Sequence, residues 1–176
     1  QVARRAIAKE DRVAILGLRL IDSPTTCRIY DSPLLDAEQA ISHRRLDGYM
    51  RAIKECGGSI SNDWIWHIPE SGGNFSRQAA REVLNASQRP DTILCMSDMI
   101  ALELLHAAHE LGIDVPGELK ITGFDGIDEA DRSRPPLTTV YQSSLEKGTL
   151  AAEKLMVGTT TSVVLKTEIK KGETAG

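Results

Sequence analysis

The stretch MSDMIALELLHAAHELGIDVPGELKITGFDGID, residues 96–128, decides the fold. It begins where the apolar run TILCM ends, and it contains a second apolar run, LKITGF, after a segment with helical periodicity. The carboxylates of Asp98 and Asp125 come at the ends of these two runs. Because α/β proteins build their pockets at the carboxyl ends of strands, the two residues could be catalytic groups, ligand-binding groups or plain helix caps.

Strand and helix patterns alternate along the rest of the chain. The apolar runs predict strands at 12–18, 63–68, 92–96, 119–124, 137–141 and 163–169. The periodic segments predict helices in the second half of 37–56 and at 75–87, 98–111 and 144–157. We expect loops at 21–36 and 126–136, and a helix N-cap at Asn74 or Ser76. Strand–helix–strand units of this length predict an α/β fold, a doubly wound parallel sheet with helices on both faces.

Composition excludes several classes of function. The 176 residues are 41% hydrophobic and 26% charged, with a net charge of -4, so binding of nucleic acid by phosphate neutralisation is not expected. No apolar run approaches the ~18 residues of a membrane helix, and the N-terminus lacks the apolar core of a signal peptide. The chain does not begin with Met, which suggests an internal segment of a longer protein. Three widely spaced cysteines form no C-x-x-C pair and fit the reducing cytoplasm.

Four polar residues are expected at the carboxyl edge of the sheet: Ser97, Asp98, Asp125, and Arg45 if its helix begins near Ser42. For Asp98, capping and a functional role are equally open. A cap is less natural for Asp125, because Gly126 follows it and no apolar helix stripe comes after. His106 and His109 share a helix without a carboxylate at ligand spacing, so we interpret them as surface residues. No motif assembles a nucleophile, a base and an orienting group.

The chain nevertheless carries a specific set of motifs. RPDTILCMSDMIALELLHAAHELGIDVPGELKITGFDGID, then RPPLTTVYQSSLEKGTLAAEKL, together with RRLDGYMRAI, resemble the LacI/GalR family of bacterial transcriptional regulators. The resemblance runs from about Val13 to Ile169. It implies a periplasmic-binding-protein-like fold of type I, with the C-terminal lobe and part of the N-terminal lobe. On this basis residues 1–30 would end the first effector-binding lobe, 31–136 would form the second lobe, 137–160 would return to the first, and 161–176 would be a closing strand and tail.

The resemblance also implies site residues. Arg45 and Asp125 correspond to the positions that bind polar groups of the effector, and Gln142 follows the TTV motif. Ser97 stands where the family usually has Asn, so contact at that point is expected to be weaker or different. We interpret Asp98 as a cap or a brace behind the site.

The chemistry of this set suits a sugar better than a purine, because a carboxylate accepts two hydroxyls while a guanidinium donates to neighbouring oxygens. An aromatic wall would come from Phe124, Tyr141 or Trp66, and the long segment 21–36 could overhang the pocket as a lid.

The predicted function is that of an effector-sensing domain, not an enzyme, of a LacI-type repressor. An N-terminal helix-turn-helix outside this chain would bind operator DNA, and the effector would control it allosterically. The resemblance implies a cytoplasmic homodimer without cofactor, metal or membrane contact. The alternatives are a periplasmic-type sugar-binding protein, which would need a signal peptide, and an enzyme using Asp98 or Asp125 as a base. The sequence upstream of Gln1 and a test for turnover would separate the three.

Overall fold

A computed structural model of the chain describes residues 1–35 and 41–176. Its main sheet has five strands in the order β2-β3-β1-β4-β5, and all pairs are parallel except β2 with β3. The bounds of these strands are β1 Val13–Leu18, β2 Cys27–Arg28, β3 Ile65–Ile68, β4 Thr92–Cys95 and β5 Lys120–Thr122. The mostly parallel sheet confirms the predicted α/β class.

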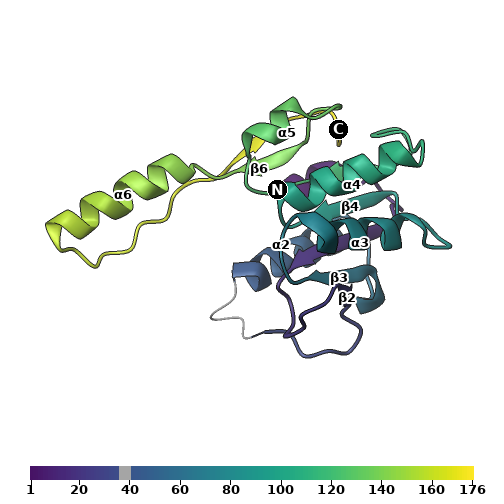
Figure 1. Ribbon diagram of the computed structural model, residues 1–176, viewed down its shortest axis with the longest axis horizontal. Helices are drawn as coiled ribbons and strands as arrows, with labels where there is room; N and C mark the ends of the chain where they lie inside the picture. The colour runs from purple at the N-terminus through teal and green to yellow at the C-terminus, as the bar shows by residue number, and fades with distance from the viewer. Residues whose placement is uncertain (36–40) are drawn as a thin grey trace.

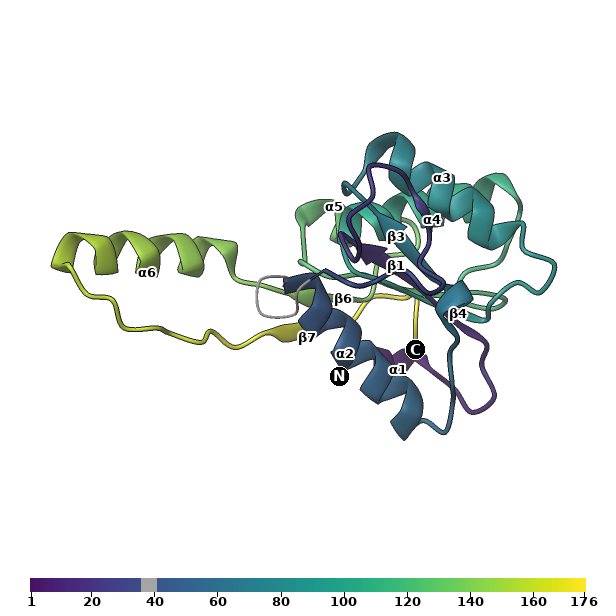
Figure 2. The same cartoon turned by 90° about the horizontal axis from the view of Figure 1, so that it is seen from below.

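Helices cover both faces of this sheet, as Figure 2 shows. Their bounds are α1 Val2–Ala6, α2 Ile41–Glu55, α3 Gly73–Leu84 and α4 Asp98–Glu110. Side chains alternate across a strand, so Leu16 joins the core under α3 and α4, whereas Ile15 joins the core under α1 and α2. Both residues are 0% exposed, as expected for the central strand of a sheet that is buried on its two faces.

The prediction that residues 1–30 end a different lobe is wrong for β1. This strand pairs with β3 on one side and β4 on the other, and it therefore lies at the centre of the same sheet. Helix α1 packs against α2 and β5. Residues 1–30 thus belong to the same body as residues 41–136. In a doubly wound sheet the first strand lies at the centre, where the strand order reverses.

Several local predictions also need correction. The segment 126–136 contains a short helix, α5 Asp128–Arg132, and 21–36 contains β2. A short 3-10 helix, η1 Asn62–Trp64, precedes β3. The cap of α3 is Gly72, whose backbone N–H donates to the hydroxyl of Ser76 inside the helix. Residues 36–40, predicted to join the loop and the helix, lie outside the described residues.

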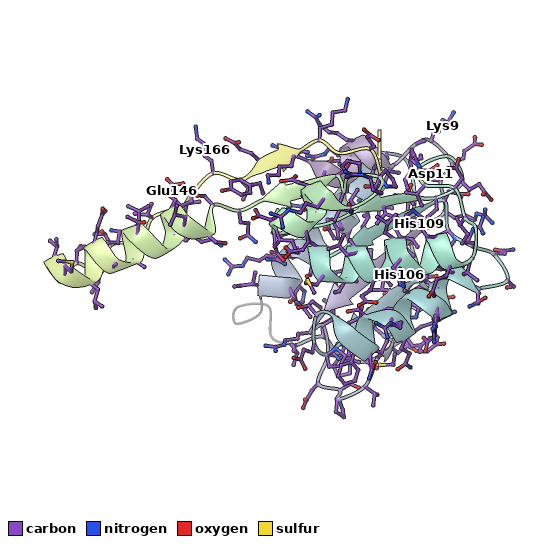
Figure 3. The ribbon with its side chains drawn as sticks, turned by 45° about the horizontal axis from the view of Figure 1, so that its top comes forward. Lys9, Asp11, His106, His109, Glu146 and Lys166 are labelled. Atoms are coloured by element: carbon purple, nitrogen blue, oxygen red, sulfur yellow. The ribbon has the colours of Figure 1, made fainter. Side chains whose placement is uncertain are left out.

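The last part of the chain forms an arm. A two-stranded antiparallel sheet, β6 Thr139–Tyr141 with β7 Glu168–Lys170, leads to helix α6 Ser144–Val157. The predicted strand 163–169 is confined to its last residues and Lys170, because only these meet a partner in β6. Figure 1 shows α6 and the segment after it extending away from the body. In Figure 3 the labelled Glu146 and Lys166 lie on this arm.

The end of the chain returns to the body and is packed there. The Thr174 hydroxyl donates to the carbonyl of Ile121 at 2.7 Å, and Thr174 is fully buried. No helix in the described ranges has the length and apolar character needed to cross a membrane.

Candidate functional site

Helix α2 is fastened to the carboxyl end of β4 by two hydrogen bonds. The buried hydroxyl of Tyr49 donates to the carbonyl of Cys95 at 2.9 Å, and Arg45 Nη1 donates to the carbonyl of Met96 at 2.6 Å. The two residues are one helical turn apart, so they lie on the same face of α2. This anchoring places Arg45 at the carboxyl edge of the sheet, where the sequence predicted it.

The guanidinium of Arg45 is further fixed by two neighbours after β5. Its central carbon lies 3.9 Å from the centre of the Phe124 ring, which is a close cation–π contact. Its Nη2 lies 3.5 Å from Oδ1 of Asp125. The Arg45 side chain is 17% exposed and that of Asp125 is 35% exposed, so the pair stands at a boundary between the core and solvent. A ligand could therefore reach both groups.

The backbone at Asp125 has an unusual conformation. Its φ is +124°, in a region that side chains with a Cβ seldom adopt, and such a residue costs about 1–3 kcal/mol. Its N–H donates to the carbonyl of Val140, and its own carbonyl accepts from the N–H of Gln142. These two bonds to β6 and its end hold the strained residue in place. Strain of this kind often marks a functional position.

Asp125 also accepts a hydrogen bond from a side chain. Nε2 of Gln142 donates to its Oδ1 at 2.8 Å. Burial raises the pKa of Asp125 above its ordinary value, while the charge of Arg45 opposes this rise. A hydrogen-bond donor on a ligand would therefore stabilise the ionised carboxylate of Asp125.

Asp98 lies behind the site and is fully buried. One carboxylate oxygen accepts from the N–H groups of Gly126 at 2.6 Å and Ile127 at 2.9 Å, and the other accepts from the hydroxyl of Thr139 at 2.5 Å. A Cβ on Gly123 would lie 2.1 Å from this carboxylate, so the chain needs glycine there. Asp98 therefore connects α4, the loop that carries Asp125, and β6.

Ser97 caps α4. Its hydroxyl accepts from the N–H of Met99 at 3.2 Å, and the residue is 3% exposed. It lies next to Met96, whose carbonyl binds Arg45, but it does not line the hollow described next. The structure therefore brings Arg45, Asp125 and Gln142 into direct contact and places Ser97 beside them, with its hydroxyl engaged in the cap.

A hollow of about 400 Å³ opens beside these groups. The start of α1, helix α2, the segment after β5, and strands β6 and β7 surround it. Its lining residues include Arg45, Tyr49, Phe124, Gln142 and Ile169, and Asp125 lies behind Arg45 and Gln142 without lining it. A second hollow of about 550 Å³ adjoins it beside the arm, and the two share the lining residues Ile41, Arg44, Gln142 and Thr167. The first volume is within the range of small-molecule sites.

Of the three candidates for the predicted aromatic wall, one lines the hollow. Phe124 lines the hollow and lies against Arg45. Trp66 is fully buried in the core on the α3 side, where its indole N–H donates to Glu82 at 3.1 Å. Tyr141 lies near Lys170 on the ribbon of the arm. The prediction for Trp66 is wrong because alternate residues of β3 point to opposite faces of the sheet.

The segment 21–35 does not line the hollow beside Arg45. It runs along the outer edge of the sheet, where β2 pairs with β3. Its anchor is His67, which the sequence did not single out. This ring is 1% exposed, and its Nδ1 accepts from the N–H groups of Leu20 and Ile21 at 3.0 and 3.2 Å.

The other histidines and the cysteines offer no catalytic arrangement within the described ranges. His106 and His109 are exposed on α4, as predicted, and Figure 3 labels both on that helix. Cys95 is buried and free, and burial raises the pKa of its thiol. Over residues 1–35 and 41–176 no group of three His, Cys, Asp or Glu side chains is arranged to hold a metal ion.

Comparison with known proteins identifies the family of the chain. Residues 29–171 match the family described as the periplasmic binding protein-like domain. The HTH-type transcriptional repressor PurR of Photobacterium profundum is 33% identical over 124 residues, which cover 68% of this chain and 36% of that protein. The chain therefore spans about a third of the length of the curated relatives it matches.

Solved structures show the same fold. A transcriptional regulator of the LacI family from Sanguibacter keddieii superposes with a TM-score of 0.72 at 23% identity, covering 94% of this chain and 58% of that one. The transcriptional regulator CelR in complex with cellobiose gives a TM-score of 0.72 at 21% identity, covering 98% of this chain and 51% of that one.

Proposed function

This chain belongs to the family of periplasmic binding protein-like domains, as the effector-binding domain of a LacI-type regulator, and we propose that it senses a sugar. In the proposed function the sugar binds in the hollow beside Arg45 and Asp125. Its binding controls how tightly an N-terminal helix-turn-helix of the intact regulator holds operator DNA. The regulator acts as a homodimer in the cytoplasm.

The observation that carries the proposal is the contact of Asp125 with Arg45 and Gln142, two residues that line a hollow of about 400 Å³. The carboxylate offers acceptors, and the guanidinium and the amide offer donors. Vicinal hydroxyl groups can donate to the first and accept from the second. Phe124 adds an apolar ring behind them, against which Arg45 is already packed.

A sugar is favoured over a purine by the balance of these groups. The partly exposed carboxylate of Asp125 and the guanidinium of Arg45 can together hydrogen-bond to neighbouring hydroxyl groups of a sugar ring. The likeness to CelR, which was solved with cellobiose, supports the same class of ligand. The name of the relative PurR keeps purines in the panel of compounds to be tested.

An enzymatic role is disfavoured by the same geometry. Asp98 uses both carboxylate oxygens to hold backbone and hydroxyl donors, so it is not free to accept a proton from a substrate. Asp125 is the remaining candidate base, and no nucleophilic side chain lies among its hydrogen-bond partners in the described residues. The relatives cited above are named as regulators and repressors.

The experiment that tests the proposal is a titration of the intact regulator with a panel of sugars, nucleosides and purine bases, with and without operator DNA. An effector changes DNA affinity only through its different affinities for two conformations, and the coupling is reciprocal. We expect one sugar to bind and its affinity to depend on operator DNA. A purine that does so instead would correct the ligand class, and turnover of any compound would overturn the proposal.

A further inference from the structure

The side-chain amide of Gln142 lies between two groups of opposite charge. Its Nε2 donates to Oδ1 of Asp125 at 2.8 Å, and its Oε1 accepts from Nζ of Lys147 at 2.9 Å. A carboxylate can only accept and an ammonium can only donate. One orientation of the amide therefore satisfies both partners, and the reversed orientation would lose both charge-assisted bonds.

Lys147 belongs to a helix with little other attachment to the body. None of the residues of α6 is buried, and Figure 1 shows the helix projecting from the ribbon of β6 and β7. Gln142 lies at the junction between β6 and α6, one residue before the Ser143 cap of the helix. The bond from Lys147 thus crosses from the first turns of the arm back to the site.

These contacts form a continuous series of side chains. It begins at Arg45 on α2, passes through Asp125 after β5 and Gln142 after β6, and ends at Lys147 on α6. Each member comes from a different element, so a shift of α6 relative to the body would change the last link first.

We propose that Lys147 is a positioning residue of the effector site, which orients Gln142 toward Asp125 and so links the position of α6 to the state of that carboxylate. The inference rests on the proposed function, because it assigns Asp125 as the group that meets the effector. Gln142 donates to Oδ1 of Asp125, which leaves Oδ2 to accept a hydrogen bond from a ligand. Binding there and movement of α6 then influence each other, as linkage requires.

The charges that face Asp125 make the link measurable without an effector. Arg45 from α2 and Lys147 from α6 favour its ionised form, whereas Asp98 from α4 disfavours it. Arg45 and Asp98 are held by bonds within the body, at Met96 and at Gly126. Lys147 is the contributor whose place depends on the arm.

The test is an NMR titration of the Asp125 carboxyl carbon in the ligand-free chain, together with the side-chain NH₂ signals of Gln142. Lys147→Met removes the ammonium. Lys154→Met is the matched control, because it removes the same charge from the same helix and its Nζ binds Thr161 rather than Gln142.

We expect Lys147→Met to raise the pKa of Asp125 and to shift and broaden the Gln142 NH₂ signals, while Lys154→Met leaves both as in the unaltered chain. Equal behaviour of the two variants, or wild-type signals in Lys147→Met, would overturn the proposal. Since no effector is present in this experiment, its failure is distinguishable from failure of the proposed function, which would appear as absence of sugar binding.

Discussion

The guanidinium of Arg45 and the carboxylate of Asp125 lie 3.5 Å apart, although 80 positions separate them in the sequence. Arg45 donates a hydrogen bond to the carbonyl of Met96 and packs against the ring of Phe124. Asp125 is held by Gln142 and by a strained backbone. A pair fixed on both sides before any ligand arrives is preorganised for binding, because little side-chain entropy remains to be lost.

The first prediction concerns Asp98, whose role is structural. Asp98→Ala leaves two backbone N–H groups and the Thr139 hydroxyl without their buried acceptor. Because an unsatisfied buried donor costs about 1–3 kcal/mol, we expect a loss of about 3 kcal/mol or more in the free energy of unfolding. Denaturant unfolding at neutral pH measures it. A loss under about 1 kcal/mol would show that Asp98 is not a brace.

The second prediction concerns the stability contributed by Asp125. Burial raises its pKa, so the folded state binds this proton more tightly than the unfolded state. Stability due to this group therefore falls as pH rises from the ordinary carboxyl pKa through the raised one. Asp125→Asn removes the titration and keeps a side chain of nearly the same shape at this backbone position.

We expect Asp125→Asn to gain stability relative to the unaltered chain between about pH 3 and pH 7. The control is Asp98→Ala, which is expected to be destabilised at both pH values. Denaturant unfolding at the two ends of the range measures the difference. If the free energy of unfolding of Asp125→Asn falls relative to that of the unaltered chain between about pH 3 and pH 7, the direction of the pKa shift is contradicted.

The third prediction concerns His67 and acid. Its Nδ1 accepts from two backbone N–H groups, and its Nε2 lies 3.0 Å from the carbonyl of Ser23, so the folded state requires the neutral ring. Burial lowers the pKa of His67 below its ordinary value. The folded state binds the proton less tightly, so stability is present above the ordinary pKa of about 6.5 and is lost as pH falls below it.

A His67→Gln variant lacks this titration. We expect the free energy of unfolding of the unaltered chain to fall more steeply than that of the variant between about pH 7 and pH 5. The same substitution at the exposed His106 of α4 serves as the control for the change of side chain. Parallel pH profiles for all three proteins would rule out the assigned role of His67.

The sequence predicts the class of fold well because apolar runs and helical periodicity reflect burial directly. It misplaces β1, since the order of strands in a sheet is set by crossover connections and not by position along the chain. The predicted strand over 163–169 shortens to three residues for a related reason. A strand exists only where a partner offers hydrogen bonds, and β6 provides them only opposite residues 168–170.

The candidate site illustrates a second limit. Asp98 and Asp125 both follow apolar runs, yet Asp98 is fully buried, whereas the side chain of Asp125 is partly exposed beside Arg45. Only tertiary contacts with β6 separate the two roles. The helical pattern placed Arg45 at the edge of the sheet, and the resemblance to a known family gave it a ligand-binding role. Its contact with Phe124 and Met96 is not visible in any local pattern. His67 was missed for the same reason.

Effector binding by Arg45 and Asp125 is tested most directly by calorimetry of the intact regulator with the sugar found in the panel. Three variants are compared with the unaltered protein: Asp125→Asn, Arg45→Gln and the control Arg77→Gln, whose guanidinium pairs with Glu103 on another surface. We expect the first two to weaken binding by about 2–4 kcal/mol, because each removes a charged hydrogen-bonding partner, and the control to leave it unchanged. Affinity equal to that of the unaltered protein in both Asp125→Asn and Arg45→Gln would show that the sugar binds elsewhere.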